Sequence, residues 1–199
     1  MIKPDITHVK NIKEFYKEIV EAQQGSHGKE YTQHHNALVK CAEECETIKE
    51  LGVCQGATLA AMLMTNPKKI TGYDIAPHYF LPYIKHFHKY AEDNNVEFSY
   101  ENMSSHDKSS ISEVDLLHID SLHQPHHLLQ ELKLHAPHVK KYIVFHDTAN
   151  FKGTKGLFET IAHYITEIEQ EWSVVDHYIQ RVGYTVIKRT PRLEYINTV

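Results

Sequence analysis

The sequence predicts an α/β fold in which a mostly parallel sheet is covered by helices on both faces. From Thr47 onward, short apolar segments alternate with amphipathic helical segments, which is typical of such a sheet. The last two strand-like segments lie too close together for a helical crossover, so we expect them to form an antiparallel pair. With 199 residues the chain suits one domain. We expect a helical cap over residues 1–46 and a core over residues 47–199.

Helical spacing dominates the N-terminal part. Apolar residues recur every three or four positions at Ile12, Phe15, Tyr16, Ile19 and Val20. The pattern breaks at residues 24–28, which contain two glycines. A second helix is expected over residues 32–44.

The remainder of the chain supplies seven strands with helices between them. The expected strands are Thr47–Leu51, 69–75, 96–100, 116–119, 142–145, Trp172–Tyr178 and Tyr184–Arg189. The expected helical stripes are 59–63, 80–90, 128–132 and 157–168. Ligands of open parallel sheets bind at the carboxyl ends of the strands, so we looked for functional residues there.

Composition excludes several classes of partner. The formal net charge is −5, from 21 basic and 26 acidic residues, which gives no electrostatic case for nucleic acid or an anionic membrane. No apolar segment approaches the roughly 20 residues of a membrane span. The N-terminal residues do not open a signal-peptide pattern. The chain has only three cysteines, so we expect no disulfide framework and a cytoplasmic location.

The first two strands end in residues that suit a nucleoside. A turn containing Gly52 and Gly56 follows the first strand, and Asp74 ends the second about twenty residues later. Glycines let backbone amides approach a ligand, and an acid at that distance can accept hydrogen bonds from ribose hydroxyls. Cys54 stands where a dinucleotide fingerprint has its second glycine, which argues against a dehydrogenase. An adenosine-containing ligand is therefore expected.

The fourth and fifth strands end in acids. Asp120 and Asp147 would meet at one edge of the sheet, and two converging carboxylates suit a hard divalent cation. His123 follows Asp120 by three residues and is placed to act as a general base.

These motifs combine into a family pattern. The blocks are Glu50-x-Gly52-x-x-x-Gly56-x-Thr58, Asp74, Leu116-Leu117-His118-Ile119-Asp120-Ser121-x-His123 and Ile143-Val144-Phe145-His146-Asp147-Thr148. Over residues 47–189 they resemble the class I S-adenosylmethionine-dependent methyltransferases. Within this class, the motifs are similar to those of the metal-dependent sugar and antibiotic O-methyltransferases, related to the cephalosporin-hydroxylase group.

The resemblance implies a Rossmann-like, doubly wound, seven-stranded sheet with an antiparallel last strand, and S-adenosylmethionine as cofactor. It also implies methyl transfer to a small hydroxylated acceptor, whose pocket we expect to be formed by residues 1–46 and the loop 148–156. The implied cofactor contacts are Glu50, Gly52, Gly56, Thr58, Asp74, Asn102, Met103, Ser104 and Asp120.

The same resemblance implies a metal held by Asp120 and Asp147, with His123 taking the proton from the acceptor. Mg²⁺ is the expected ion. Family members often carry an acid where His146 stands, and adjacent strand residues point to opposite faces. We therefore expect His146 to join the site only if the strand has already ended, in which case Mn²⁺, Fe²⁺ or Zn²⁺ would also suit it.

Two alternatives stay open at this point. The chain could be a non-catalytic S-adenosylmethionine-binding module, which would not need the set of Asp120, His123 and Asp147 to bind metal. It could also be a metal-dependent hydroxylase or hydrolase on the same fold, which iron or zinc without methyl transfer would reveal. The sequence does not name the acceptor, and it is compatible with a homo-oligomer.

Overall fold

A seven-stranded sheet forms the centre of the protein. The computed structural model describes residues 8–27, 31–149, 155–168 and 171–190. The strands are β1 (Thr47–Leu51), β2 (Lys69–Asp74), β3 (Glu97–Asn102), β4 (Val114–Ile119), β5 (Val139–His146), β6 (Trp172–Tyr178) and β7 (Tyr184–Arg189). Their order is β3-β2-β1-β4-β5-β7-β6, and β7 is antiparallel to both of its neighbours. The predicted fold class, including the antiparallel last strand, is confirmed.

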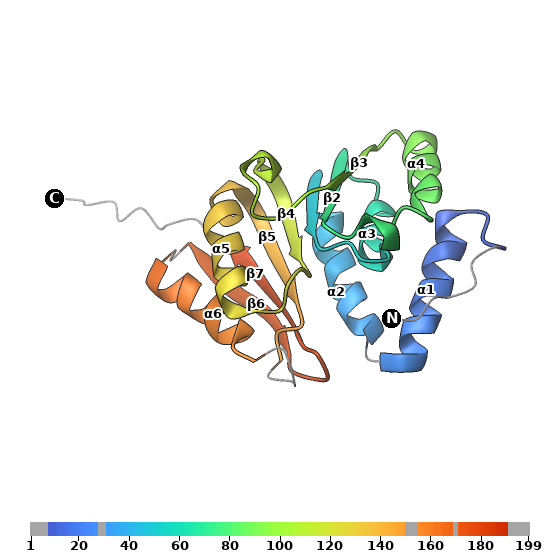
Figure 1. The fold of residues 1–199 in the computed structure, drawn as a ribbon. Helices are drawn as coiled ribbons and strands as arrows, with labels where there is room; N and C mark the ends of the chain where they lie inside the picture. Colours follow the sequence, from blue (N-terminus) through green and yellow to red (C-terminus); the bar gives the residue numbers. More distant parts are fainter. Residues whose placement is uncertain (1–7, 28–30, 150–154, 169–170, 191–199) are drawn as a thin grey trace.

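Helices cover both faces of this sheet (Figure 1). They are α1 (Ile12–His27), α2 (Tyr31–Glu43), α3 (Ala57–Leu63), α4 (Ile84–Asp93), α5 (Pro125–His135) and α6 (Leu157–His163). Shorter 3₁₀ segments are η1 (Pro77–Tyr79), η2 (Lys108–Ser110) and η3 (Ala136–His138), and a π-helical segment, η4, covers Tyr164–Ile168. The first four α-helices lie on one face of the sheet, while α5 and α6 lie on the other.

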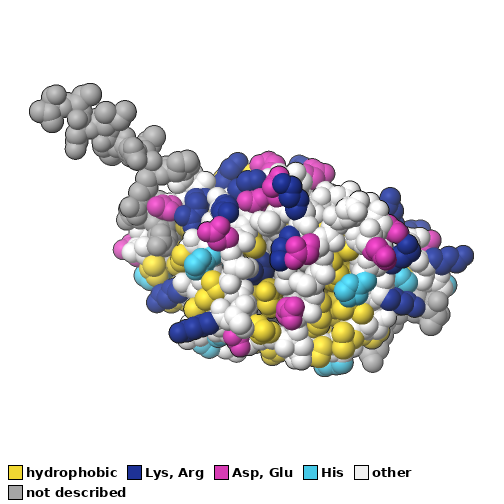
Figure 2. Space-filling model, turned by 90° about the horizontal axis from the view of Figure 1, so that it is seen from above, with side chains coloured by type: hydrophobic (Ala, Val, Ile, Leu, Met, Phe, Trp, Pro, Cys, Tyr) yellow, Lys and Arg dark blue, Asp and Glu magenta, His cyan; other side chains and the backbone are white. Residues whose placement is uncertain are grey.

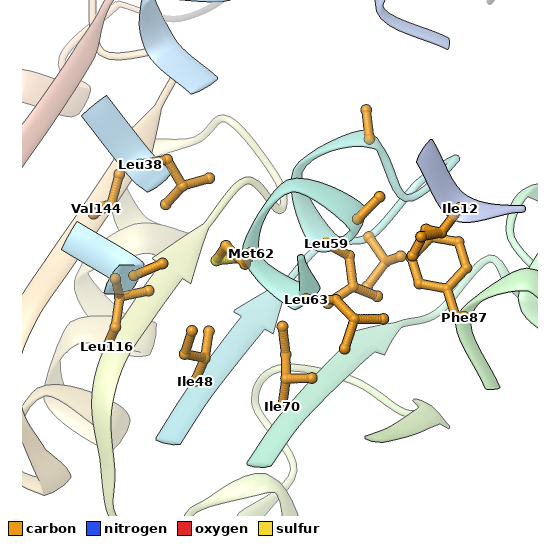
Figure 3. Packing of buried hydrophobic residues seen from close by; sticks show 14 of the residues in the cluster. Ile12, Leu38, Ile48, Leu59, Met62, Leu63, Ile70, Phe87, Leu116 and Val144 are labelled. Atoms are coloured by element: carbon orange, nitrogen blue, oxygen red, sulfur yellow. The ribbon is translucent and has the colours of Figure 1, made fainter. Parts of the chain in front are cut away.

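Each face of the sheet has its own apolar core. Leu116 and Leu117 are neighbours in β4 and both fully buried, yet they belong to opposite cores because side chains alternate along a strand. Leu116 packs in the cluster shown in Figure 3 with residues of α1 to α4, whereas Leu117 packs with residues of α5 and α6. Burying each leucine stabilises the fold by about 1.5–3 kcal/mol.

Several expected boundaries differ from the structure, most by one to three residues. β3 runs to Asn102, so this residue ends the strand and does not lie in the loop after it. The stripe at 80–90 was expected to be one helix, but α4 begins only at Ile84 because Pro82 disfavours a helical backbone at Leu81. The last stripe changes from α6 to a π-helical segment at Tyr164.

The turn after β1 lies directly against the end of β4. Gly52 has a φ of +89°, and a Cβ on it would come within 2.1 Å of the carbonyl oxygen of Asp120. The amide of Asp120 also donates a 2.8 Å hydrogen bond to the carbonyl of Leu51. Only glycine allows this approach, which holds the ends of the two central strands together.

On the face of the molecule that Figure 2 shows, basic and acidic side chains are interspersed. Among the described residues, none of the helices has both the length and the apolar character needed to cross a membrane.

Candidate active site

A cavity of about 540 Å³ opens at the carboxyl ends of the strands. That volume falls within the range of roughly 300–1,000 Å³ typical of small-molecule sites. Its wall includes Gly52, Cys54, Asp74, Met103, Ser104, Ser105, Asp120, Ser121, His123, His127, His146 and Asp147. The cavity therefore brings together the residues predicted to bind a nucleoside and those predicted to bind a metal.

Asp74 is tied to the backbone around it as well as lining the cavity. Its Oδ2 accepts hydrogen bonds from the amides of Val53 (2.9 Å) and Cys54 (2.7 Å), and its Oδ1 accepts one from Ala76 (2.7 Å). A carboxylate has about four acceptor positions, so a position remains for a ribose hydroxyl. Asp74 thus also holds the glycine turn in place, a role that its position in the sequence did not reveal.

Four of the predicted cofactor contacts do not line the cavity. Glu50 is fully buried, and its Oε1 accepts hydrogen bonds from Thr58 (2.5 Å) and His118 (2.7 Å). Burial raises the pKa of Glu50, although the hydrogen bonds from His118 and Thr58 oppose this. Gly56 faces the core, since a Cβ there would lie 2.7 Å from the Phe80 ring. The side chain of Asn102 instead donates a 2.9 Å hydrogen bond to the carbonyl of Asp74.

The predicted metal ligands do converge. Asp120, His146 and Asp147 each offer a donor atom, and these atoms lie within 4.8 Å of one another. His146 Nδ1 is 3.1 Å from Asp147 Oδ2 and 3.5 Å from Asp120 Oδ1. From the sequence we expected His146 to join the site only if the strand ended before it. That condition is not met, because His146 is the last residue of β5. His146 and Asp147 nevertheless share the site because Asp147 adopts a positive φ of 58°, which turns the chain there and lets its carboxylate meet the His146 ring.

His123 completes the cluster. Its Nε2 lies 2.9 Å from Asp147 Oδ2 and 3.2 Å from Asp120 Oδ1. Burial alone would lower the pKa of His123, but the hydrogen bonds to Asp120 and Asp147 outweigh it and raise the pKa to about 10. Burial likewise opposes the effect of Asp120 and Asp147 on His146, whose pKa also rises to about 10. At neutral pH both imidazoles are therefore protonated and balance the charge of the two carboxylates.

One residue beside this cluster was missed by the sequence argument. His34 of α2 places its Nδ1 3.4 Å from Nε2 of His146, and its ring stacks on Tyr184 at 5.3 Å between centroids. Burial and the neighbouring His146 lower the pKa of His34 to about 4, so its ring is neutral at pH 7. The neutral Nδ1 of His34 can accept a hydrogen bond from Nε2–H of His146, which orients that ring toward the carboxylates. Only the packing of α2 against the sheet brings His34 here, so no local pattern could have found it.

Comparison with known proteins places the chain in a family. The sequence model of a methyltransferase domain family matches residues 49–148, which is half of the chain. This segment begins in β1 and ends directly after Asp147, so it contains Gly52, Asp74 and the cluster of Asp120, His123, His146 and Asp147. No curated protein sequence matches the chain.

Solved structures share the fold at low sequence identity. An O-methyltransferase from Bacillus cereus in complex with SAH covers 94% of each chain with a TM-score of 0.60 and 13% identity. The N-methyltransferase NodS from Bradyrhizobium japonicum WM9 covers 81% of this chain and 97% of its own, with a TM-score of 0.58 and 11% identity. Magnesium protoporphyrin IX methyltransferase from Synechocystis, with bound SAM, covers 80% of each chain, with a TM-score of 0.58 and 8% identity.

The family match and the strand order agree with each other. The matched segment carries the glycine turn, Asp74 and both acid-bearing strand ends, and the sheet has the antiparallel β7 expected of this fold. The chain belongs to the class I S-adenosylmethionine-dependent methyltransferases.

Proposed function

We propose that the protein transfers the methyl group of S-adenosylmethionine to a hydroxyl of a small acceptor, assisted by a divalent cation. The observation that carries this proposal is the convergence of Asp120, His146 and Asp147 beside His123. This cluster borders the same cavity as Gly52 and Asp74, which suit the cofactor. The methyl donor and a metal-held acceptor would therefore share one space.

The cavity fits the cofactor in chemistry and in size. Asp74 would accept a hydrogen bond from a ribose hydroxyl, and the turn at Gly52 and Cys54 would lie along the cofactor. Met103 and Ser104 would lie beside the adenine. Glu50, Gly56, Thr58 and Asn102 would act by holding this wall in place, since they do not line the cavity.

The donor set fits a divalent cation. Two carboxylates that converge in a buried place need a positive charge, and here protonated His123 and His146 supply it. Asp120 and Asp147 alone would suit Mg²⁺, which keeps several waters. If His146 releases its Nδ1 proton and becomes a third ligand through that atom, the set also suits Mn²⁺, Fe²⁺ or Zn²⁺.

When bound, the metal would lower the pKa of an acceptor hydroxyl and orient it. His123 must then be neutral at Nε2 to receive the proton, although its pKa of about 10 keeps it charged beside two unscreened carboxylates. A cation on Asp120 and Asp147 would remove that stabilisation and leave His123 as a base near neutral pH. The cavity walls would align the acceptor with the methyl group, and such positioning can supply about 7–11 kcal/mol.

Calorimetric titration with S-adenosylhomocysteine, with and without Mn²⁺, tests this proposal together with a methyl-transfer assay over a panel of small hydroxylated compounds. We expect the Asp120→Asn variant to bind the nucleoside nearly as well as the wild type, yet to lose metal-dependent transfer. If the wild type binds S-adenosylhomocysteine but no metal, the chain is better described as a binding module. Metal-dependent hydroxylation or hydrolysis without methyl transfer would identify the other alternative.

A further inference from the structure

A second cluster of metal-ligand side chains lies at the cavity wall, which its member His127 helps to line. His127 and Glu131 are one turn apart on α5, and His106 lies between β3 and η2. A donor atom from each of the three residues lies within 4.8 Å of the others. The rings of His106 and His127 are 4.0 Å apart between centroids. This set shares no residue with Asp120, His146 and Asp147.

The carboxylate of Glu131 indicates that this cluster is built to hold a ligand. Glu131 is fully buried, and its Oε1 accepts a 2.7 Å hydrogen bond from Ser121 and lies 3.2 Å from Nε2 of His127. Its Oε2 is also buried and has no hydrogen-bond partner among the residues that the structure describes. A buried carboxylate oxygen without a partner is costly, so a cation at this point would satisfy it.

The chemistry of the donors selects the kind of cation. Two imidazoles and one carboxylate are ligands that Zn²⁺ binds, with water completing its four-coordinate shell. Mg²⁺ and Ca²⁺ prefer oxygen donors, so they suit this cluster less well than the one at Asp120. Two ligands spaced four residues apart on one helix reach the same point, because such positions share a helix face.

We propose that His106, His127 and Glu131 bind a divalent transition metal of the Zn²⁺ class. Such an ion joins α5 to the segment after β3, which also contributes Met103 and Ser104 to the cavity wall. It would fix this segment against the helix, as a structural metal does. The alternative is a plain hydrogen-bonded pair of His127 and Glu131 with a second histidine stacked on it.

Zinc counting separates these two cases. The protein is stripped with a chelator, dialysed against Zn²⁺, and its bound zinc is measured per chain in the wild type, His106→Ala and His126→Ala. His106 is only half-buried, so its replacement should leave the fold intact, and His126 is an exposed histidine of α5, the helix that carries His127 and Glu131. We expect His106→Ala to hold one zinc ion fewer than His126→Ala and, after loading with Co²⁺ in place of Zn²⁺, to show weaker visible absorption than His126→Ala. Circular dichroism checks that both variants are folded.

This comparison does not depend on the proposed active-site metal. If both sites bind zinc, the counts for His126→Ala and His106→Ala are two and one, and if the Asp120 site binds none they are one and zero. Glu131→Gln should lose the same ion. If that buried variant does not fold, the comparison of His106→Ala with His126→Ala decides alone. Equal zinc counts in His106→Ala and His126→Ala would overturn the proposal and leave the cluster as a hydrogen-bonded pair.

Discussion

The Nε2 atom of His123 lies 2.9 Å from Oδ2 of Asp147, although the two residues follow different strands. The contact exists because β4 and β5 are parallel neighbours whose carboxyl ends meet at one edge of the sheet. It places a titratable side chain between two carboxylates at the wall of the cavity. The proposed roles of the base and of the cation both depend on this relationship.

Replacing His123 tests its proposed role as general base. His123→Ala should lower kcat by about 10²–10⁴ and should leave the affinity for S-adenosylhomocysteine unchanged. Because the base must be neutral to accept a proton, the wild-type rate should fall toward acidic pH and the variant should lack that decline. Steady-state kinetics across pH check this, with His126→Ala as an exposed histidine control. Turnover near the wild-type value, with the acidic decline intact, would show that His123 is not the base.

The metal-free protein should lose stability as the pH rises above neutrality. The pKa values of His123 and His146 are raised to about 10 by Asp120 and Asp147, against an ordinary value near 6.5. A group with a raised folded pKa contributes stability that is fully present below pH 6.5 and is lost as the pH rises toward 10. Chemical denaturation in EDTA between pH 6 and pH 10 should show this decline. The decline should be smaller in His123→Ala, and an equal slope in both proteins would contradict the assigned pairing.

Removing the Asp74 carboxylate should weaken cofactor binding. Asp74→Ala removes the acceptor for a ribose hydroxyl and also releases the amides of Val53 and Cys54. We expect a loss of about 1.5–3 kcal/mol in the binding free energy of S-adenosylhomocysteine, measured by calorimetry. Asp107→Ala, which removes an exposed carboxylate that caps η2, is the control. Unchanged affinity in a folded Asp74 variant would remove this residue from the cofactor site.

Gly52 should be the least replaceable glycine of the site. An alanine there would strain the backbone by about 1–3 kcal/mol, and its Cβ would collide with the carbonyl of Asp120 at 2.1 Å. Gly156 has nearly the same φ, +86°, but among the described residues a Cβ there would meet only the Pro125 side chain, at 3.1 Å. Gly52→Ala should therefore lower the free energy of unfolding by more than Gly156→Ala does. Equal losses in urea denaturation would show that the contact with Asp120 does not matter.

The strand ends could be predicted from the sequence because they depend on local patterns. Alternating apolar segments located β1, β6 and β7 to the residue, and the parallel topology then placed Asp74, Asp120 and Asp147 at one edge. The place of His146 in the site was harder to predict, because it depends on a positive φ at Asp147. Few residues other than glycine adopt such a φ.

Contacts made by tertiary packing could not be predicted in this way. His34 reaches the site only because α2 packs on the sheet, and His106 meets Glu131 only because a loop lies against α5. The backbone bonds of Asp74 likewise depend on how closely two strand ends approach each other. Residues 150–154 of the loop expected to shape the acceptor pocket lie outside the described residues.

The most direct test is a crystal structure of the protein with S-adenosylhomocysteine and Mn²⁺, with anomalous data collected at the manganese edge. The proposed function predicts one anomalous peak bounded by Asp120, His146 and Asp147, and nucleoside density that reaches Asp74 and Met103. It also predicts that His123 no longer contacts both carboxylates. Nucleoside density in this cavity without an anomalous peak at the three ligands, in crystals grown with excess Mn²⁺, would contradict the metal-assisted mechanism.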